Sequence, residues 1–365
     1  MLLYNLIRLS IFAIFVYTAF CNLNFLGGAW QTKVNNTSPD PYEIIRRKFD
    51  PLLGLRAVAF LMVFLGHWFM VVFPPVDISN PNGSLIIRAL FSASPWGGVW
   101  VFFTLSGYLM GKGFVSGRYM LNRSGIILFY RNRALRIIPL YFLSVFIVAL
   151  FSKPQFFQFL NATSLDSFLA EIFFDSQGHG AIGALWSIST EVQFYIAIPF
   201  IHIICYRHMT SFTRVLAISL IIISLIAGLK VLSMMGWHYF WHRHVYYPVL
   251  ANMDCFFAGY TSAVIVQILR ERSFYLTLGM KLGVAIGTIC YAILAYLSYI
   301  FMVQEFTPNR LIFLGVAPSF TAIMTAIIII IFEISKRQTS GDGFFFQKFW
   351  LVQSFIGTLT YSLYV

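Results

Sequence analysis

Long apolar segments alternate with short polar ones along almost the whole chain. Each is close to the roughly 20 helical residues that cross the hydrocarbon core of a bilayer. Helix is the expected structure, because an open sheet would leave backbone groups unpaired in lipid. The pattern predicts an all-α, polytopic transmembrane helix bundle of about nine to ten spans. The expected spans lie at about 53–73, 95–111, 137–151, 185–206, 215–233, 247–269, 282–303, 311–332 and 349–365.

An earlier apolar run, at about 9–29, precedes a polar stretch that contains Asn35 and Pro39. This run fits either an additional span or a signal-like segment. The basic cluster Arg46–Lys48 favours a retained anchor, because cleavage after the first run would export that cluster. We therefore divide the chain into 1–50, an N-terminal apolar anchor with a polar cytoplasmic linker, and 51–365, a membrane domain.

The composition excludes a water-soluble protein. Hydrophobic residues make up 59% of the 365 residues and charged residues only 10%, whereas soluble proteins carry roughly 25% charged residues. The mean hydropathy is +0.78. The net charge of +12 could suggest nucleic acid, but the basic residues form short clusters between apolar runs. Such clusters set membrane orientation and attract anionic lipid, so we expect membrane lipids and no nucleic acid as partners.

Lysine and arginine are concentrated in alternate loops. Seventeen fall on one side and five on the other, and the positive-inside rule places the first side in the cytoplasm. The five residues assigned to the outer side are Arg88, Lys153, Lys230, Arg243 and Arg310.

Ionisable residues inside spans are costly and are therefore functional candidates. Arg56 and His67 are eleven residues apart, which puts them on one helix face, separated by about 16 Å along the axis. Counted from the outer ends of their spans, His67, Glu191 and Asp254 should share one layer roughly 10 Å below the outer surface. A histidine with carboxylates suits general-base chemistry. It suits a proton relay in a transporter equally well.

Other polar positions are less specific. Ser106 follows two glycines in its span and can hydrogen-bond across helices, which is typical of helix packing. Arg133 and Arg136 share a helical face at the expected cytoplasmic rim, where they suit phosphate binding or simple anchoring. We interpret the aromatic loop with three histidines as an interfacial belt and predict no metal site. These histidines are His238, His242 and His244.

Several motifs occur in order along 50–365. They are Arg56-x10-His67, Phe102–Gly107, Arg133-Ala134-Leu135-Arg136 before Pro139, Leu185–Tyr195, Asp254 with Gly259 and Ala263, and Tyr361–Tyr364. Together they strongly resemble the integral-membrane acyltransferase-3 family, whose bacterial members O-acylate surface polysaccharides.

The resemblance implies an acyl-CoA donor, expected to be acetyl-CoA, on the cytoplasmic side, with no permanently bound cofactor. It implies an acceptor hydroxyl on a cell-envelope glycan or lipid-linked sugar, and a bacterial inner membrane as the location. We expect His67 to take the proton of that hydroxyl, while Glu191 or Asp254 orients His67 or the acceptor. The expected substrate-binding residues are Arg56, Ser106, Arg133, Arg136 and Trp186.

The chain departs from the family pattern at a few positions. Leu53 and Asn252 stand where an acidic residue and an arginine are usual. Family members usually continue past the Ser-Leu-Tyr segment, whereas this chain ends at Val365, so we expect the domain 51–365 to lack its last helix. Two other functions fit the same residues: a proton-coupled transporter or glycan export component, and an inactive truncated relative.

Overall fold

All regular elements that the structure describes are helices, as the apolar pattern predicts. The computed structural model describes residues 51–72, 94–151, 186–236, 246–277, 282–293 and 308–335. The predictions for the 9–29 anchor, the three-histidine loop and the 349–365 span lie outside these ranges. The main helices are α3 (Pro51–Val72), α5 (Ser94–Val115), α6 (Arg123–Phe151), α8 (Trp186–Tyr206), α9 (Phe212–Gly236), α10 (Met253–Glu271) and α12 (Pro308–Ile334).

Within the described ranges, three helical segments are long and apolar enough to cross a membrane: Trp186–Tyr206, Phe212–Met235 and Ile312–Ile334. Two shorter apolar segments, Pro51–Phe64 and Leu282–Ile293, are also helical. The all-α class is therefore confirmed. The count of nine to ten spans stays a prediction.

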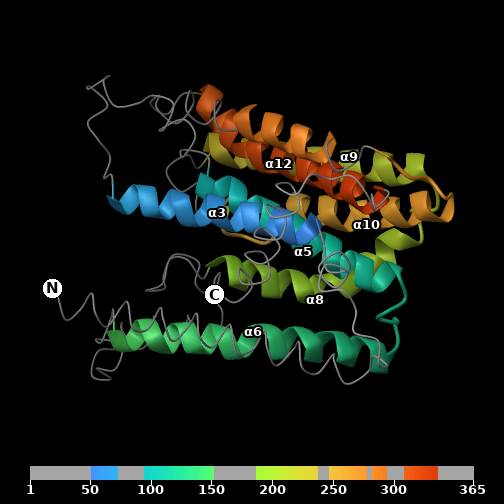
Figure 1. Ribbon diagram of the computed structural model, residues 1–365, viewed down its shortest axis with the longest axis horizontal. Helices are drawn as coiled ribbons and strands as arrows, with labels where there is room; N and C mark the ends of the chain where they lie inside the picture. Colours follow the sequence, from blue (N-terminus) through green and yellow to red (C-terminus); the bar gives the residue numbers. More distant parts are fainter. Residues whose placement is uncertain are drawn as a thin grey trace, which may run out of the picture.

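Helix α5 lies at the centre of the bundle and contacts α3, α8, α10 and α12 (Figure 1). Helix α9 packs on α10 and α12, and α6 packs on α8. Helices α3 and α5 run antiparallel, because Gly66 near the end of α3 lies against Pro95 at the start of α5. Gly98, one turn further along α5, lies against the backbone of Ala59.

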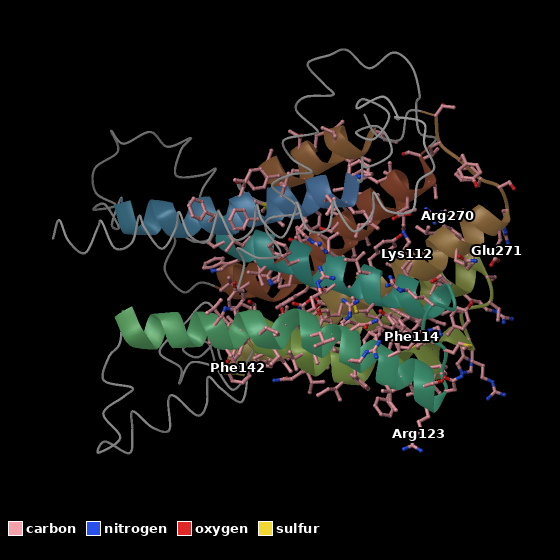
Figure 2. The ribbon with its side chains drawn as sticks, turned by 60° about the horizontal axis from the view of Figure 1, so that its bottom comes forward. Lys112, Phe114, Arg123, Phe142, Arg270 and Glu271 are labelled. Atoms are coloured by element: carbon pink, nitrogen blue, oxygen red, sulfur yellow. The ribbon has the colours of Figure 1, made fainter. Side chains whose placement is uncertain are left out.

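Basic side chains gather at one end of the bundle. Lys112, near the end of α5, donates to Glu333 of α12 at 2.8 Å, and Arg270 at the end of α10 pairs with the same carboxylate. Figure 2 shows Arg123, the first residue of α6, at this end as well. The charge pattern assigns these residues to the cytoplasmic side, so this end of the bundle is the one predicted to face the cytoplasm.

The closest approach between two helices joins α5 to α10. A Cβ atom at Gly107 would collide with the carbonyl oxygen of Phe256, and one at Gly259 would collide with that of Thr104. Only glycine leaves enough room for two backbones to pass so closely. The contact buries α10 almost completely from Asp254 to Val266 and fixes its depth along α5.

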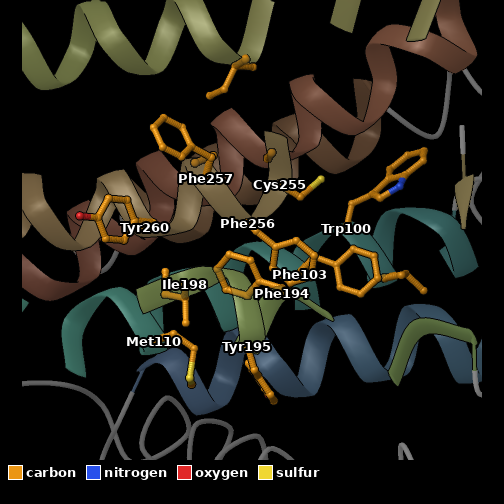
Figure 3. Close-up of a cluster of buried hydrophobic side chains, with 14 of the residues drawn as sticks. Trp100, Phe103, Met110, Phe194, Tyr195, Ile198, Cys255, Phe256, Phe257 and Tyr260 are labelled. Atoms are coloured by element: carbon orange, nitrogen blue, oxygen red, sulfur yellow. The ribbon is translucent and has the colours of Figure 1, made fainter. Parts of the chain in front are cut away.

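Three aromatic rings hold α8 against this pair of helices. Phe194 of α8 stacks on Phe256 of α10 with ring centroids 4.1 Å apart, and the ring centroid of Phe103 of α5 lies 4.7 Å from that of Phe256. Figure 3 shows the three rings together at the centre of the core. All three side chains are buried, so the stack fixes the position of α8 relative to α5.

Helix α10 begins later than the sequence predicts. The expected span starts at 247, whereas the helix starts at Met253. Pro248 lacks a backbone N–H, and Asn252 holds the preceding turn by donating from Nδ2 to the carbonyls of Tyr246 at 2.5 Å and Pro248 at 3.0 Å. Asp254 consequently lies in the first turn of α10 and not seven residues into a span.

The glycine contact predicts a sharp difference between two alanine substitutions. Gly259→Ala should destabilise the protein by about 1–3 kcal/mol, because the collision can be relieved only by separating two backbones. Gly228 of α9 has open space around it, so Gly228→Ala should be neutral or stabilise by about 0.5–1 kcal/mol through helix propensity. Thermal unfolding of both purified variants in lipid nanodiscs measures the difference. Equal melting temperatures would show that α5 and α10 do not touch at this point.

Candidate functional site

Glu191 accepts hydrogen bonds from two hydroxyl groups on a single carboxylate oxygen. Ser106 Oγ of α5 donates to Glu191 Oε1. Tyr195, one turn further along α8, donates to the same oxygen at 2.5 Å. Hydrogen bonds to a charged acceptor are about twice as strong as neutral ones. The structure thus joins two predicted site residues, Ser106 and Glu191, and adds Tyr195. The signal for Tyr195 was its spacing of four residues from Glu191 within one motif.

Arg133 lies next to this cluster on the predicted cytoplasmic side. Its guanidinium carbon is 6.0 Å from the ring centroid of Tyr195 and 5.9 Å from that of Phe129, within the range of cation–π contacts. Helix α6 starts at Arg123, about 15 Å earlier along the axis. Arg133 therefore lies further into the bundle than the rim where the sequence places it. The half-buried Arg136 follows on the same helical face.

Tyr119 extends this row of side chains toward the loop between α5 and α6. Its buried hydroxyl accepts a hydrogen bond from Asn132 at 3.4 Å, and Arg118 lies 5.5 Å from its ring. Burial acts to raise the pKa of the phenol. The hydrogen bonds from Asn132 and Arg133 and the charges of the two arginines outweigh it, so the pKa of Tyr119 lies below its ordinary value. Arginines and tyrosines thus alternate from the loop to Glu191.

His67 does not share the depth of Glu191. Gly66, its neighbour in α3, packs against Pro95, while the Glu191 carboxylate bonds to Ser106, eleven residues further along α5. At 1.5 Å per residue this is about 16 Å. The prediction of a common layer is therefore wrong for His67, because the helices do not all begin at the same depth. The described residues include the backbone of His67 but not its side chain.

Arg56 is much closer to the depth of Glu191. It lies on α3 between Leu52 and Ala59, and these two residues belong to one hydrophobic cluster with Val101 and Leu105 of α5. The half-buried Arg56 is thus level with the stretch of α5 that leads into Ser106. Arg56 and Arg133 therefore lie nearer than His67 to the end of the bundle that is predicted to face the cytoplasm.

Asp254 belongs to a separate cluster between α9, α10 and α12. Lys230 Nζ donates to Asp254 Oδ2 at 2.5 Å, and Ser319 Oγ donates to the same oxygen. The backbone N–H of Cys255 donates to Oδ1 at 2.9 Å. The Lys230 and Asp254 side chains are 2% and 0% exposed. Both Asp254 oxygens are engaged, and the partners that bond to them lie on α9, α10 and α12.

The assignment of Lys230 to an outer loop is wrong. Lys230 lies inside α9, six residues before the helix ends at Gly236, and it is buried against Asp254. Its place within the predicted span 215–233 was the available signal, because a lysine inside a membrane helix needs a counter-charge. The remaining distribution of charge still favours the same orientation.

Trp186 lies in an aromatic cluster on the opposite side of Glu191 from Arg133. Its ring centroid is 5.8 Å from that of Phe103, 4.5 Å from that of Tyr246 and 5.0 Å from that of Tyr247. Thr190 of the same helix donates to the Tyr247 carbonyl at 2.7 Å, and this bond holds Tyr247 against α8. Trp186 is 6% exposed, so in this structure it packs the core, and its role in substrate binding stays a prediction.

The Lys230–Asp254 pair predicts that a single substitution lowers the stability of the protein and that a double substitution restores most of it. Lys230→Met should destabilise the protein by about 3–5 kcal/mol, because it leaves a buried carboxylate without its cation. The double variant Lys230→Met/Asp254→Leu should recover most of this loss, since well-packed apolar side chains often replace a buried pair at no cost. Thermal unfolding in nanodiscs measures both. A double variant as unstable as the single one would argue against a pairing of these charges.

Comparison with known proteins agrees with the order of motifs. A family model for an acyltransferase domain, that of the acyltransferase-3 family, matches residues 51–365. No curated protein and no solved structure matches the chain. The match covers all the described helices, and several of these are apolar enough to span a bilayer. The chain is an integral membrane protein that belongs to the acyltransferase-3 family.

Proposed function

We propose that this acyltransferase moves an acetyl group from cytoplasmic acetyl-CoA to a hydroxyl of a cell-envelope glycan or lipid-linked sugar, in a bacterial inner membrane. Family membership supports the class of reaction. The observation that supports the finer proposal is the row of contacts from Arg133 through Tyr195 to Glu191 and Ser106. It leads from the predicted cytoplasmic end into the bundle, as a path for a CoA donor would.

The arginines suit the phosphates of the donor. Guanidinium groups bind phosphate with paired N–H donors, and Arg56, Arg133 and Arg136 all belong to the predicted cytoplasmic half of the bundle. An extended pantetheine arm would then carry the thioester toward His67. The separation of about 16 Å between Arg56 and His67 along α3 is a suitable length for such an arm.

The transfer needs one base. In the proposed reaction His67 takes the proton of the acceptor hydroxyl, and the resulting oxygen nucleophile attacks the thioester carbonyl. The C–S bond breaks as the new ester C–O bond forms. His67 then returns the proton to the departing thiolate, so the enzyme is unchanged after one cycle. Donor and acceptor would reach the carbonyl from opposite sides of the membrane.

Removing Arg133 should weaken donor binding. Arg133→Ala should raise the Kd for CoA about tenfold or more, because a charge-assisted contact with phosphate is lost. Titration of nanodisc-embedded protein with CoA measures this value. Arg131→Ala is the matched control, since Arg131 lies on the same helix but is exposed. An unchanged Kd in the Arg133 variant would refute the assignment of phosphate to this arginine.

Removing His67 should abolish transfer and leave donor binding intact. A general base contributes about 10²- to 10⁴-fold to the rate, so His67→Ala should lose at least 100-fold in transfer of radiolabelled acetyl groups to envelope carbohydrate. His208→Ala, at an exposed histidine after α8, is the control. Near-normal transfer by a correctly inserted His67→Ala protein would exclude His67 as the base. A wild type that binds no CoA and transfers no label would overturn the proposed function.

A further inference from the structure

Glu191 is too far from the level of His67 to act on the same reacting atoms. The carboxylate lies beside Ser106, about 16 Å along α5 from the residue that packs next to His67. Groups that act on one acyl carbonyl must lie within about 3–3.5 Å of it. If His67 is the base, Glu191 does not take part in the proton transfer and has a different role.

The Glu191 carboxylate has capacity left for a ligand. Its two described hydrogen bonds, from Ser106 and Tyr195, both go to Oε1. An ionised carboxylate has about four lone-pair sites on its two oxygens. The two hydroxyls therefore orient the group without saturating it. Asp254 is the contrast within the same protein, because both of its oxygens are engaged and its charge is met by Lys230.

The neighbours of Glu191 indicate what kind of ligand it would accept. Tyr195 touches Glu191 through its hydroxyl and Arg133 through its ring, so a donor whose phosphates contact Arg133 would bring its pantetheine arm past Glu191. That arm is uncharged and carries two amide N–H groups and a hydroxyl. Each of these would lose a water partner on entering the bundle, which is unfavourable unless a protein group replaces that partner.

We propose that Glu191, held by Ser106 and Tyr195, is a binding site for an N–H or O–H group of the donor's pantetheine arm. The inference rests on the proposed function for the identity of the donor. It assigns Glu191 to donor binding and leaves proton transfer to His67. Tyr195 is a positioning residue, because it acts on the donor only through Glu191 and Arg133.

A comparison of two acyl donors, one with a pantetheine arm and one without it, distinguishes binding of the arm from proton transfer. Glu191→Gln should weaken CoA binding about 10- to 100-fold, the loss expected for a hydrogen bond to a charged group. The same variant should match wild type in the slow transfer from ethyl thioacetate, a thioester with neither phosphates nor amides. Nanodisc-embedded protein, labelled donors and envelope carbohydrate serve for both measurements.

The opposite pattern would overturn the inference. If Glu191→Gln slows transfer equally from acetyl-CoA and ethyl thioacetate and leaves the Kd for CoA unchanged, then Glu191 takes part in proton transfer and not in binding the arm. Unchanged binding and unchanged transfer would also refute it. The proposed function fails separately, when wild type binds CoA in a Glu191-dependent manner but transfers no acetyl group.

A smaller substitution tests the same role with less risk of disturbing the fold. Tyr195→Phe keeps the ring beneath Arg133 and removes only the hydroxyl that orients Glu191, so CoA binding should weaken several-fold while the melting temperature stays close to that of wild type. Tyr260→Phe is the matched control, since it removes a buried hydroxyl bonded to His202 on the neighbouring helix, and it should leave CoA binding unchanged. Equal Kd values for the two variants would contradict the role of Tyr195.

Discussion

The geometry of the site depends on the contact between the backbones of α5 and α10 at Gly107 and Gly259. Lipid is as apolar as the helix surfaces, so helices in a membrane associate mainly through close packing, and small residues permit the closest approach. This contact sets the depth of α10 and so brings Phe256 into the stack with Phe103 and Phe194. The stack holds α8, and the position of α8 in turn puts Glu191 beside Ser106.

The carboxylates of Asp254 and Glu191 meet different environments as a result. Asp254 faces Lys230 and is almost completely excluded from solvent, and such a pair is stable only when its polar atoms are well satisfied. That cluster therefore joins three helices and offers little to a ligand. Glu191 has hydroxyl partners and stays half-buried. Two hydroxyl partners orient the carboxylate but bring no counter-charge to it. It can therefore still accept a strong hydrogen bond from an uncharged N–H or O–H group of a ligand.

The sequence predicts the helical class and several boundaries well, because apolar runs leave few alternatives in lipid. The predicted span 185–206 and helix Trp186–Tyr206 differ by one residue. The depth of the candidate site residues within the bundle was predicted less well. Counting from span ends assumes a common starting level, whereas Asn252 delays the start of α10 and the packing of Gly66 on Pro95 sets the register of α3. Local spacing also could not reveal the Ser106–Glu191 bond, which joins residues 85 apart.

The separation in depth between Arg133 and His67 has a physical rationale in the proposed reaction. Phosphates are strongly hydrated, and taking such charges into a low-dielectric interior costs far more than burying neutral groups. An enzyme that keeps the phosphates among arginines and admits only the arm avoids that cost. The remaining penalty comes from the amides and hydroxyl of the arm, which need acceptors along the path. A carboxylate fixed by two hydroxyls at the depth of Arg56 would supply such an acceptor at the start of that path.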